Sequence, residues 1–346
     1  MKSGLFDMHT KAGARMATVD GWDVPDIFSS FEAEYEAAHA GAVVYDSSPL
    51  GRLRLTGRTR VDFLHRMSTN DLISLGPGQG AATIFTTPLA RIVDRTLAYV
   101  RETDVLVLTS RGAQAQLSNW LRKHIFFNDD VHVRDASGDY ELVTIFGPAA
   151  GELASRLAGR AVADLKLHAW RPASGNWLVA RADPIAGDGF HVIAPPDALP
   201  GVWQAALDAG AVPMGERAFE VLRIEAGRPR YPRELSEAYI PLEVGLWGDV
   251  SFSKGCYTGQ EIIARMESRH RLAKQLVGLR AAAALEAGVE LRVDGVSVGQ
   301  VTSAAARPDG SSVALSVVKP AHAMPGARLA FGERAGEAEV VTFPIR

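Results

Sequence analysis

One stretch of the chain combines residue types that could do covalent chemistry. It contains the only cysteine of the sequence, Cys256, two positions after Lys254. Thr258 and Glu261 follow in the T-x-x-E pattern of a helix capping box, in front of an apolar pair. A helix N-terminus and a nearby ammonium both favour a thiolate over a thiol. The pattern predicts a reactive, accessible Cys256 with a catalytic role, assisted by Lys254, between a strand ending at Ser253 and the start of a helix. A small residue packed under a tight turn explains the same pattern equally well.

Basic residues gather on both sides of this stretch. Three lie before it in a loop rich in proline, and four follow the expected helix: Arg228, Arg230 and Arg233, then Arg265, Arg269, Arg271 and Lys274. They could pair with the carboxylates of a ligand, with RNA or with an acidic partner. A solvated face is the alternative for either group. Aromatic and basic residues do not alternate as they do in single-strand binders, so direct RNA binding is not expected.

Other motifs are uninformative about chemistry. The nine histidines show no H-E-x-x-H pattern and no C-x-x-C companion, so we expect no metal site. The glycine-rich run at 76–80 lacks the Lys-Ser/Thr of a phosphate-binding loop and is interpreted as a turn.

Composition limits the class of protein. The 346 residues are 47% hydrophobic and 22% charged with a formal net charge of -3, which predicts two or three globular domains. No apolar run approaches the roughly 20 residues that span a bilayer, and the first residues lack a signal-peptide core. A single cysteine fits a reducing compartment and cannot by itself supply the usual thiolates of an iron–sulfur cluster. We therefore expect a cytoplasmic protein without membrane partners.

The expected secondary structure mixes strands and helices without a strict alternation. Alternating β-branched runs predict strands at 53–56, 81–86, 92–100, 104–109, 140–146, 177–181 and 189–193. Helices are expected at 31–39, 58–70, 113–123, 149–157, 199–209 and 215–226. After about residue 272, short strands separated by Gly, Pro and Asp predict a small β-barrel or sandwich, with a hairpin turn at Asp294 and Gly295. The fold class is α+β, with one region at 1–272 and a C-terminal β-barrel domain at 273–346.

The string K-G-C-Y-T-G-Q-E at 254–261, followed by Arg265, resembles the signature of the YgfZ family of folate-binding proteins. Further segments are similar to the related T-protein of glycine cleavage, including L-R-I-E-A-G at 222–227 and G-Q-V-T-S at 299–303. The resemblance covers nearly the whole chain. It implies a ring of three domains around a folate-sized channel, with the two N-terminal α+β domains interleaved in sequence.

The resemblance also implies a cofactor, partners and contacts. The cofactor would be tetrahydrofolate or a one-carbon derivative, and the partners iron–sulfur enzymes, including tRNA-modifying ones, or cluster assembly proteins. Arg228 and Arg230 are candidates for the glutamate tail. The full set of expected cofactor-binding residues is Asn70, Asp94, His191, Arg228, Arg230, Tyr231, Glu243, Trp247, Tyr257, Gln260, Glu261 and Arg265.

Two positions depart from the T-protein pattern. Asp94 matches the first Asp of its paired-Asp motif, but Arg95 stands where the catalytic second Asp belongs, and a guanidinium cannot act as a base. His191 replaces the Glu that grips the pterin edge, and a neutral imidazole accepts one hydrogen bond where a carboxylate accepts two. These departures favour an accessory factor for iron–sulfur enzymes over a tetrahydrofolate-dependent aminomethyltransferase or demethylase. A thiol-based protein that has lost folate is the third possibility.

Overall fold

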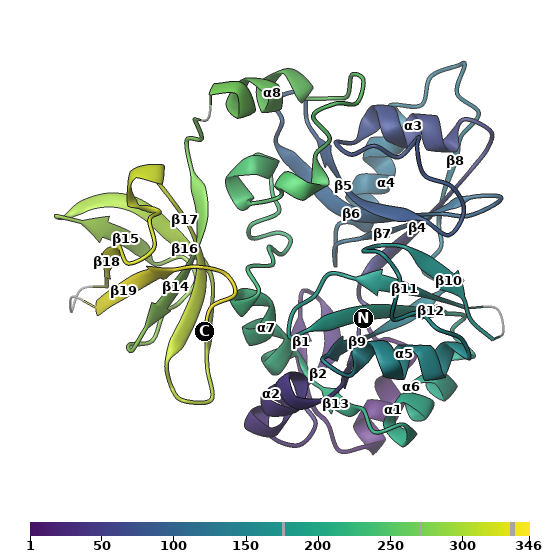
Figure 1. Ribbon diagram of the computed structural model, residues 1–346, viewed down its shortest axis with the longest axis horizontal. Helices are drawn as coiled ribbons and strands as arrows, with labels where there is room; N and C mark the ends of the chain where they lie inside the picture. The colour runs from purple at the N-terminus through teal and green to yellow at the C-terminus, as the bar shows by residue number, and fades with distance from the viewer. Residues whose placement is uncertain (175–176, 270, 333–335) are drawn as a thin grey trace.

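The computed structural model describes residues 1–174, 177–269, 271–332 and 336–346. Figure 1 shows a barrel on one side, two sheets on the other, and the chain from α7 to α8 running between them. The expected mixture of strands and helices is confirmed. So is the expected interleaving, since the chain leaves one sheet after β3, builds the whole of the other, and then returns.

The first sheet is six-stranded. Its order is β10 (Trp170–Pro172), β11 (Leu178–Ala182), β12 (Asp188–Ala194), β9 (Glu141–Gly147), β3 (Val43–Asp46) and β13 (Val212–Met214). Helices α5 (Ala150–Ala158) and α6 (Leu199–Asp208) pack on one face, where they share a core with Val143, Phe190 and Val192. The short α1 (Phe6–Lys11), the hairpin β1 (Arg15–Val19) and β2 (Trp22–Ile27), and the pair α2 (Phe31–Ala40) and α7 (Glu216–Glu225) complete this unit.

The second sheet is five-stranded. Its order is β5 (Gly80–Thr86), β6 (Ile92–Val100), β7 (Val105–Thr109), β4 (Gly51–Thr56) and β8 (His132–Asp135). Helices α3 (Arg60–Met67) and α4 (Gln114–Lys123) cover its outer face with Phe63, Leu117 and Leu121. The inner face carries Leu97, Tyr99 and Leu106, which pack against Leu178 and Ile193 of the first sheet. The two sheets are therefore held face to face, and a site can form where they part.

The C-terminal strands close into a barrel in the order β14 (Gln275–Ala281), β17 (Ser312–Val318), β16 (Val296–Ala306), β15 (Glu290–Val293), β18 (Arg328–Phe331) and β19 (Gly336–Val341). A short helical turn, η3 (Pro320–His322), follows β17. Asp294 and Gly295 have φ values of 52° and 77°, the left-handed conformation of a two-residue hairpin turn, so that prediction is confirmed. The proposed boundary at 272/273 lies between α8 and β14.

The segment around Cys256 differs from expectation in two respects. No strand runs to Ser253: the described chain there passes from η1 (Pro241–Val244) and η2 (Trp247–Asp249) through irregular backbone to α8 (Gln260–Arg269). The capping box is also absent, because the Glu261 carboxylate binds Arg265 at 2.7 Å instead of turning back to the helix start. Gly259 has a φ of 84°, and this turn places Thr258 so that its carbonyl accepts from the Thr86 hydroxyl at 2.6 Å.

Candidate ligand site

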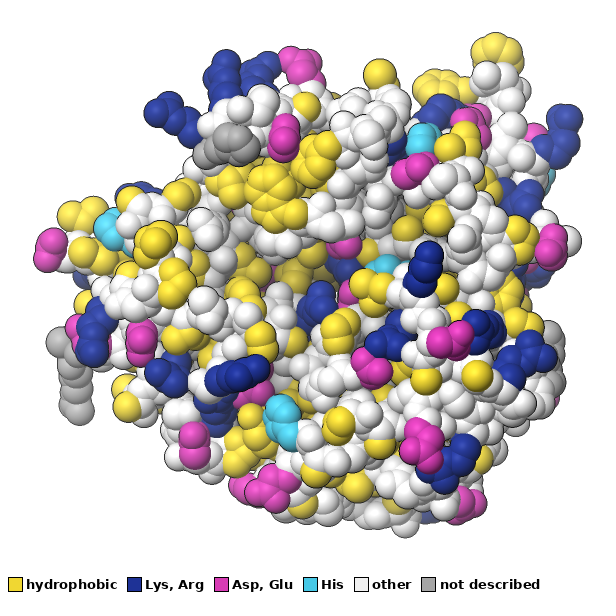
Figure 2. Space-filling view, in the orientation of Figure 1, with side chains coloured by type: hydrophobic (Ala, Val, Ile, Leu, Met, Phe, Trp, Pro, Cys, Tyr) yellow, Lys and Arg dark blue, Asp and Glu magenta, His cyan; other side chains and the backbone are white. Residues whose placement is uncertain are grey.

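A cavity of about 210 Å³ lies where the two sheets part, beside α7 and the loop that follows it. Much of its wall is apolar, formed by Leu97 and Leu108 of the second sheet, Phe146 of the first and Phe219 of α7. Phe219 stacks on Tyr45 with ring centroids 4.3 Å apart and an interplanar angle of 6°. Apolar and aromatic walls with a few polar groups are typical of sites for small organic ligands. Figure 2 shows charged side chains of both signs in the hollow at the centre of the same face of the molecule.

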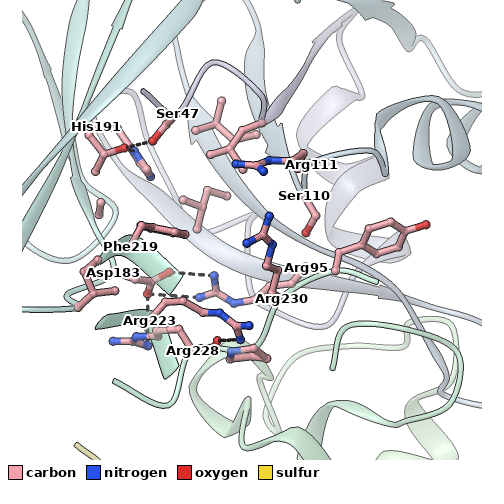
Figure 3. A pocket seen from close by; sticks show the side chains of 18 of the residues that line it. Ser47, Arg95, Ser110, Arg111, Asp183, His191, Phe219, Arg223, Arg228 and Arg230 are labelled. Carbon is pink, nitrogen blue, oxygen red and sulfur yellow. Dashed lines mark hydrogen bonds and ion pairs between the residues drawn. The ribbon is translucent and has the colours of Figure 1, made fainter. Parts of the chain in front are cut away.

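Arg95 lies on the cavity wall and is held by two carboxylates. Its Nε donates to Asp249 at 2.5 Å, and its terminal nitrogens donate to Asp183 at 2.8 and 3.3 Å. Burial alone would raise the pKa of Asp183, but the Arg95 guanidinium holds that pKa well below its usual range. Arg95 is therefore a fixed cation held by carboxylates, and its pair with Asp183 is drawn in Figure 3.

His191 lies at another part of the cavity, next to Ser47 (Figure 3). Its Nδ1 is 2.8 Å from Thr144 Oγ1, which is 2.6 Å from Ser47 Oγ. Burial lowers the pKa of His191 to about 4, so the ring is neutral near pH 7. The polar edge of the cavity is therefore a chain of uncharged donors and acceptors.

Arg228 has fewer carboxylate partners than the other arginines of the cavity wall. Arg111 pairs with Glu216 at 2.9 Å, and Arg230 pairs with the same carboxylate at 2.7 Å. Arg223 binds Glu220 and Glu234. Among the described residues, the only carboxylate near Arg228 is that of Asp183, at 3.7 Å, which also pairs with Arg95. The Arg228 Nε donates to the Pro184 carbonyl at 3.1 Å, and the Arg228 side chain is 37% exposed. It is thus the guanidinium best placed to meet an anionic group of a ligand.

The structure brings together only part of the predicted site. His191, Arg228, Arg230 and Tyr231 line the cavity. The remaining predicted residues lie outside its lining: Asn70, Asp94, Glu243, Trp247, Tyr257, Gln260, Glu261 and Arg265.

Most of these outlying residues have structural partners. Asn70 donates to the carbonyl of Ala82 at 2.8 Å, and Glu243 accepts the backbone N–H of Ile240 at 3.1 Å. Asp94 accepts the backbone N–H of Ser110 at 3.1 Å, and burial raises its pKa to about 7. These contacts hold backbone in place, and that of Asp94 holds Ser110, which lines the cavity.

Cys256 is exposed, and the polar contacts of the nearby Lys254 are made with backbone carbonyls. The Lys254 ammonium donates to the carbonyls of His65, Ser68 and Asn70 at the end of α3. It also lies 5.1 Å from the centre of the Tyr257 ring, and burial lowers its pKa to about 8. The ammonium is engaged by backbone carbonyls, and the activation of the thiol by Lys254 stays a prediction.

Sequence reasoning missed several residues of the site, including Ser47, Thr144, Asp183, Phe219 and Asp249. They are ordinary residue types in ordinary strands and loops. Only their places in the folded structure mark them as part of the site. Thr144 and His191, for example, are cross-strand neighbours on β9 and β12, which a correct prediction of the strand pairing would have revealed.

Comparison with known proteins shows the family to which the chain belongs. Residues 5–254 match the family model described as the GCVT N-terminal domain. A chloroplastic protein of Arabidopsis thaliana, provisionally named transferase At1g60990, is 36% identical over 317 residues, which cover 89% of this chain and 73% of that protein. The chain belongs to the GCVT family. A protein of Streptomyces coelicolor named aminomethyltransferase is 30% identical over 340 residues, which cover 94% of this chain and 91% of that protein.

A solved structure shows the same fold. The glycine cleavage system aminomethyltransferase T from Bartonella henselae superposes with a TM-score of 0.91 at 22% identity, covering 99% of this chain and 97% of its own. The T-protein-like fold expected for the GCVT chain is confirmed. Within the described residues, no helix is long and apolar enough to cross a membrane. Nor do three His, Cys, Asp or Glu side chains converge there as a metal site would require.

Proposed function

We propose that this GCVT-family protein is a folate-binding accessory factor of the YgfZ type, which supports the assembly or repair of iron–sulfur enzymes, including those that modify tRNA. The observation that carries the proposal is Arg95 on the cavity wall. Where the T-protein pattern needs a carboxylate, this chain has a cation neutralised by Asp183 and Asp249. Such a group neither takes up a proton nor stabilises a developing positive charge.

The residues of the cavity fit a reduced folate. Leu97, Leu108 and Phe219 give apolar surface for a flat ring, and His191 gives a polar group for the ring edge. Arg228 and Arg230 lie on the same wall, and the exposed guanidinium of Arg228, with no carboxylate closer than 3.7 Å among the described residues, can meet the glutamate tail. A bound tetrahydrofolate would supply a carrier for one-carbon groups, while these residues bind and orient it.

Cys256 supports the accessory role through its exposure and its motif. The K-G-C-Y-T-G-Q-E string resembles the YgfZ signature, and the thiol can be reached by a partner protein. In the segment that precedes it in sequence, Trp247 and Phe252 are 41% and 46% exposed, with ring centroids 6.1 Å apart. Figure 2 shows hydrophobic side chains gathered just below α8. The partners proposed here are iron–sulfur enzymes or cluster assembly proteins in a reducing compartment, the cytoplasm.

A deletion strain lacking the endogenous gene tests the role. Wild-type protein should restore the activity of iron–sulfur enzymes, and Cys256→Ala should fold normally without restoring it. Full restoration by Cys256→Ala would remove the thiol from the proposal.

The alternative is a tetrahydrofolate-dependent aminomethyltransferase or demethylase. It is favoured by the names of relatives such as the Streptomyces coelicolor protein, which is similar over nearly the whole chain. The two functions are separated by an assay of glycine cleavage with lipoyl-protein substrate. The accessory role predicts no turnover above background, whereas turnover comparable with a T-protein would establish the enzyme.

A further inference from the structure

The polar edge of the cavity consists of three uncharged groups in a row, and this arrangement is not that of a carboxylate. We propose that His191, Thr144 and Ser47 form a reversible hydrogen-bond chain that recognises the neutral lactam edge of a heterocyclic ligand, an N–H beside a C=O, in either orientation. The proposal rests on the proposed folate-binding function and specifies how the protein selects the heterocyclic ring of its ligand.

The hydrogen-bond chain is positioned by the pairing of neighbouring strands. Thr144 on β9 and His191 on β12 are direct cross-strand partners, and Tyr45 on β3 lies opposite Thr144 on its other side. Ser47 follows the end of β3, so its hydroxyl reaches Thr144 Oγ1 at 2.6 Å. The side chains are buried, with exposed fractions of 5% for Ser47, 0% for Thr144 and 7% for His191. Their positions are therefore fixed by the sheet.

Two hydrogen-bond arrangements satisfy the same heavy-atom positions, because a hydroxyl both donates and accepts. In one, the Ser47 hydroxyl donates to Thr144, the Thr144 hydroxyl donates to His191 Nδ1, and Nε2 carries the ring hydrogen. In the other, His191 Nδ1 donates to Thr144, the Thr144 hydroxyl donates to Ser47, and Nε2 is a bare acceptor. The two differ by rotation of the hydroxyls and by the ring tautomer, with no change in charge.

His191 Nε2 is the atom at the end of this hydrogen-bond chain that can contact a ligand. The described residues offer Nε2 no hydrogen-bond partner, while His191 itself lines the cavity. Burial is the largest influence on the pKa of the ring and keeps it neutral; His168 also lowers this pKa, and Asp183 raises it. Nε2 is thus an uncharged group that can donate or accept toward a ligand.

The consequence is a different selectivity from that of a carboxylate. A carboxylate accepts two parallel N–H bonds and rejects an acceptor in their place. The chain of Ser47, Thr144 and His191 can meet either the N–H or the C=O of a lactam. Folate and tetrahydrofolate carry the same lactam edge, so we expect the two to bind with affinities within about tenfold of each other, a tenfold ratio being about 1.4 kcal/mol.

The test is a calorimetric titration of the full chain with tetrahydrofolate and with folate. Thr144→Val removes the central hydroxyl at nearly constant shape, and Thr144→Ser retains it. The proposal predicts that Thr144→Val weakens both ligands more than tenfold, while Thr144→Ser stays within threefold of wild type. Both variants should melt within a few degrees of wild type, and p-aminobenzoylglutamate, which lacks the ring, should bind equally to all three proteins.

A second readout follows the ring directly. In protein labelled with ¹⁵N-histidine, the two His191 nitrogen resonances, assigned by their loss in His191→Gln, should shift when tetrahydrofolate saturates the protein. Unchanged His191 resonances at saturation, or wild-type affinity in Thr144→Val, would overturn the hydrogen-bond chain and leave folate binding intact. If neither tetrahydrofolate nor p-aminobenzoylglutamate bound, the proposed function would be refuted, and the proposed hydrogen-bond chain would fall with it.

Discussion

Arg95 and Asp249 join the ligand cavity to the segment that carries Cys256. The Arg95 Nε donates to the Asp249 carboxylate at 2.5 Å, although the residues are 154 positions apart. The Asp249 carbonyl accepts from the Thr69 hydroxyl at 2.6 Å, and Lys254 then binds three carbonyls in the same region after α3. The cavity wall and the approach to the cysteine are thus one connected set of polar contacts.

The Arg95 pairing should make a large contribution to stability. Arg95→Met leaves Asp183 and Asp249 without their cation in a part-buried site, so the free energy of unfolding should fall by roughly 3 kcal/mol. Urea unfolding measures this change in the free energy of unfolding. Arg292→Met is the matched control, because its pair with Glu290 is exposed on the barrel, and it should change stability by less than about 0.5 kcal/mol. Equal effects of the two substitutions would contradict this assignment.

The same substitution should loosen the cysteine segment. In Arg95→Met the Asp249 carboxylate loses its partner, so backbone amides at 250–256 should exchange hydrogen faster than in wild type under native conditions. Amides of β14–β19 are the internal reference, and Arg292→Met should leave 250–256 unchanged. Identical exchange in all three proteins would mean that Arg95 does not hold this segment.

Lys254 is expected to act as a structural cation. Lys254→Met leaves three carbonyls without their donor and should lower the free energy of unfolding by about 2 kcal/mol. Lys274→Met is a close control, because Lys274 also lies over a tyrosine ring, that of Tyr239, but makes one long contact to a single carbonyl at 3.4 Å. Its substitution should cost less than about 0.5 kcal/mol. A stable Lys254→Met protein with a slower thiol would instead support the activating role.

Burial of neutral His191 should make stability depend on pH. The pKa of His191 is about 4 in the folded protein, whereas an exposed histidine titrates near 6.5. As the pH falls from about 6.5 to 4, the unfolded chain takes up this proton first, and the free energy of unfolding falls by up to about 3 kcal/mol. His191→Gln, which cannot titrate, should lose less stability over this window. Parallel pH profiles for the two proteins would show that the folded ring titrates normally.

Cys256 should be reactive by exposure and dispensable for folding. Cys256→Ala should leave the melting temperature within about 2 °C of wild type, because no packed core is lost at an exposed site. Native protein should react with iodoacetamide without prior unfolding. Resistance of the native thiol, together with a large loss of stability in Cys256→Ala, would indicate a packed structural cysteine.

The sequence predicted the fold because its signals are local. Alternating β-branched residues placed the strand at 92–100, and the structure has β6 over the same residues. The Asp-Gly pair likewise gave the β15–β16 hairpin. The capping box failed for a reason that the local pattern omits: Gly259 adopts a positive φ, and an added Cβ there would lie 2.7 Å from the carbonyl oxygen of Thr87, a residue distant in sequence. The turn before α8 is thus set by a distant strand connection.

The site was predicted in part. Arg95 and His191 stood out because they break the T-protein pattern, and both line the cavity. Their partners could not be found from spacing, since Asp183 is 88 positions from Arg95 and Thr144 is 47 from His191. The contacts of Lys254 could not be found from spacing either, because its neighbours in sequence include Cys256, whereas the atoms it contacts belong to residues 65–70.

Tetrahydrofolate binding tests the account most directly. Calorimetric titration of tetrahydrofolate into wild-type protein and into Arg228→Met should show one saturable site in the first. The second should bind about tenfold or more weakly, since a charge-assisted contact to the glutamate tail contributes roughly 1.5–3 kcal/mol. The melting temperatures of the two proteins should agree closely, because Arg228 loses only a 3.7 Å carboxylate contact and one exposed hydrogen bond to the Pro184 carbonyl. Absence of heat and of thermal stabilisation at millimolar tetrahydrofolate in the wild-type protein would contradict the folate-binding function.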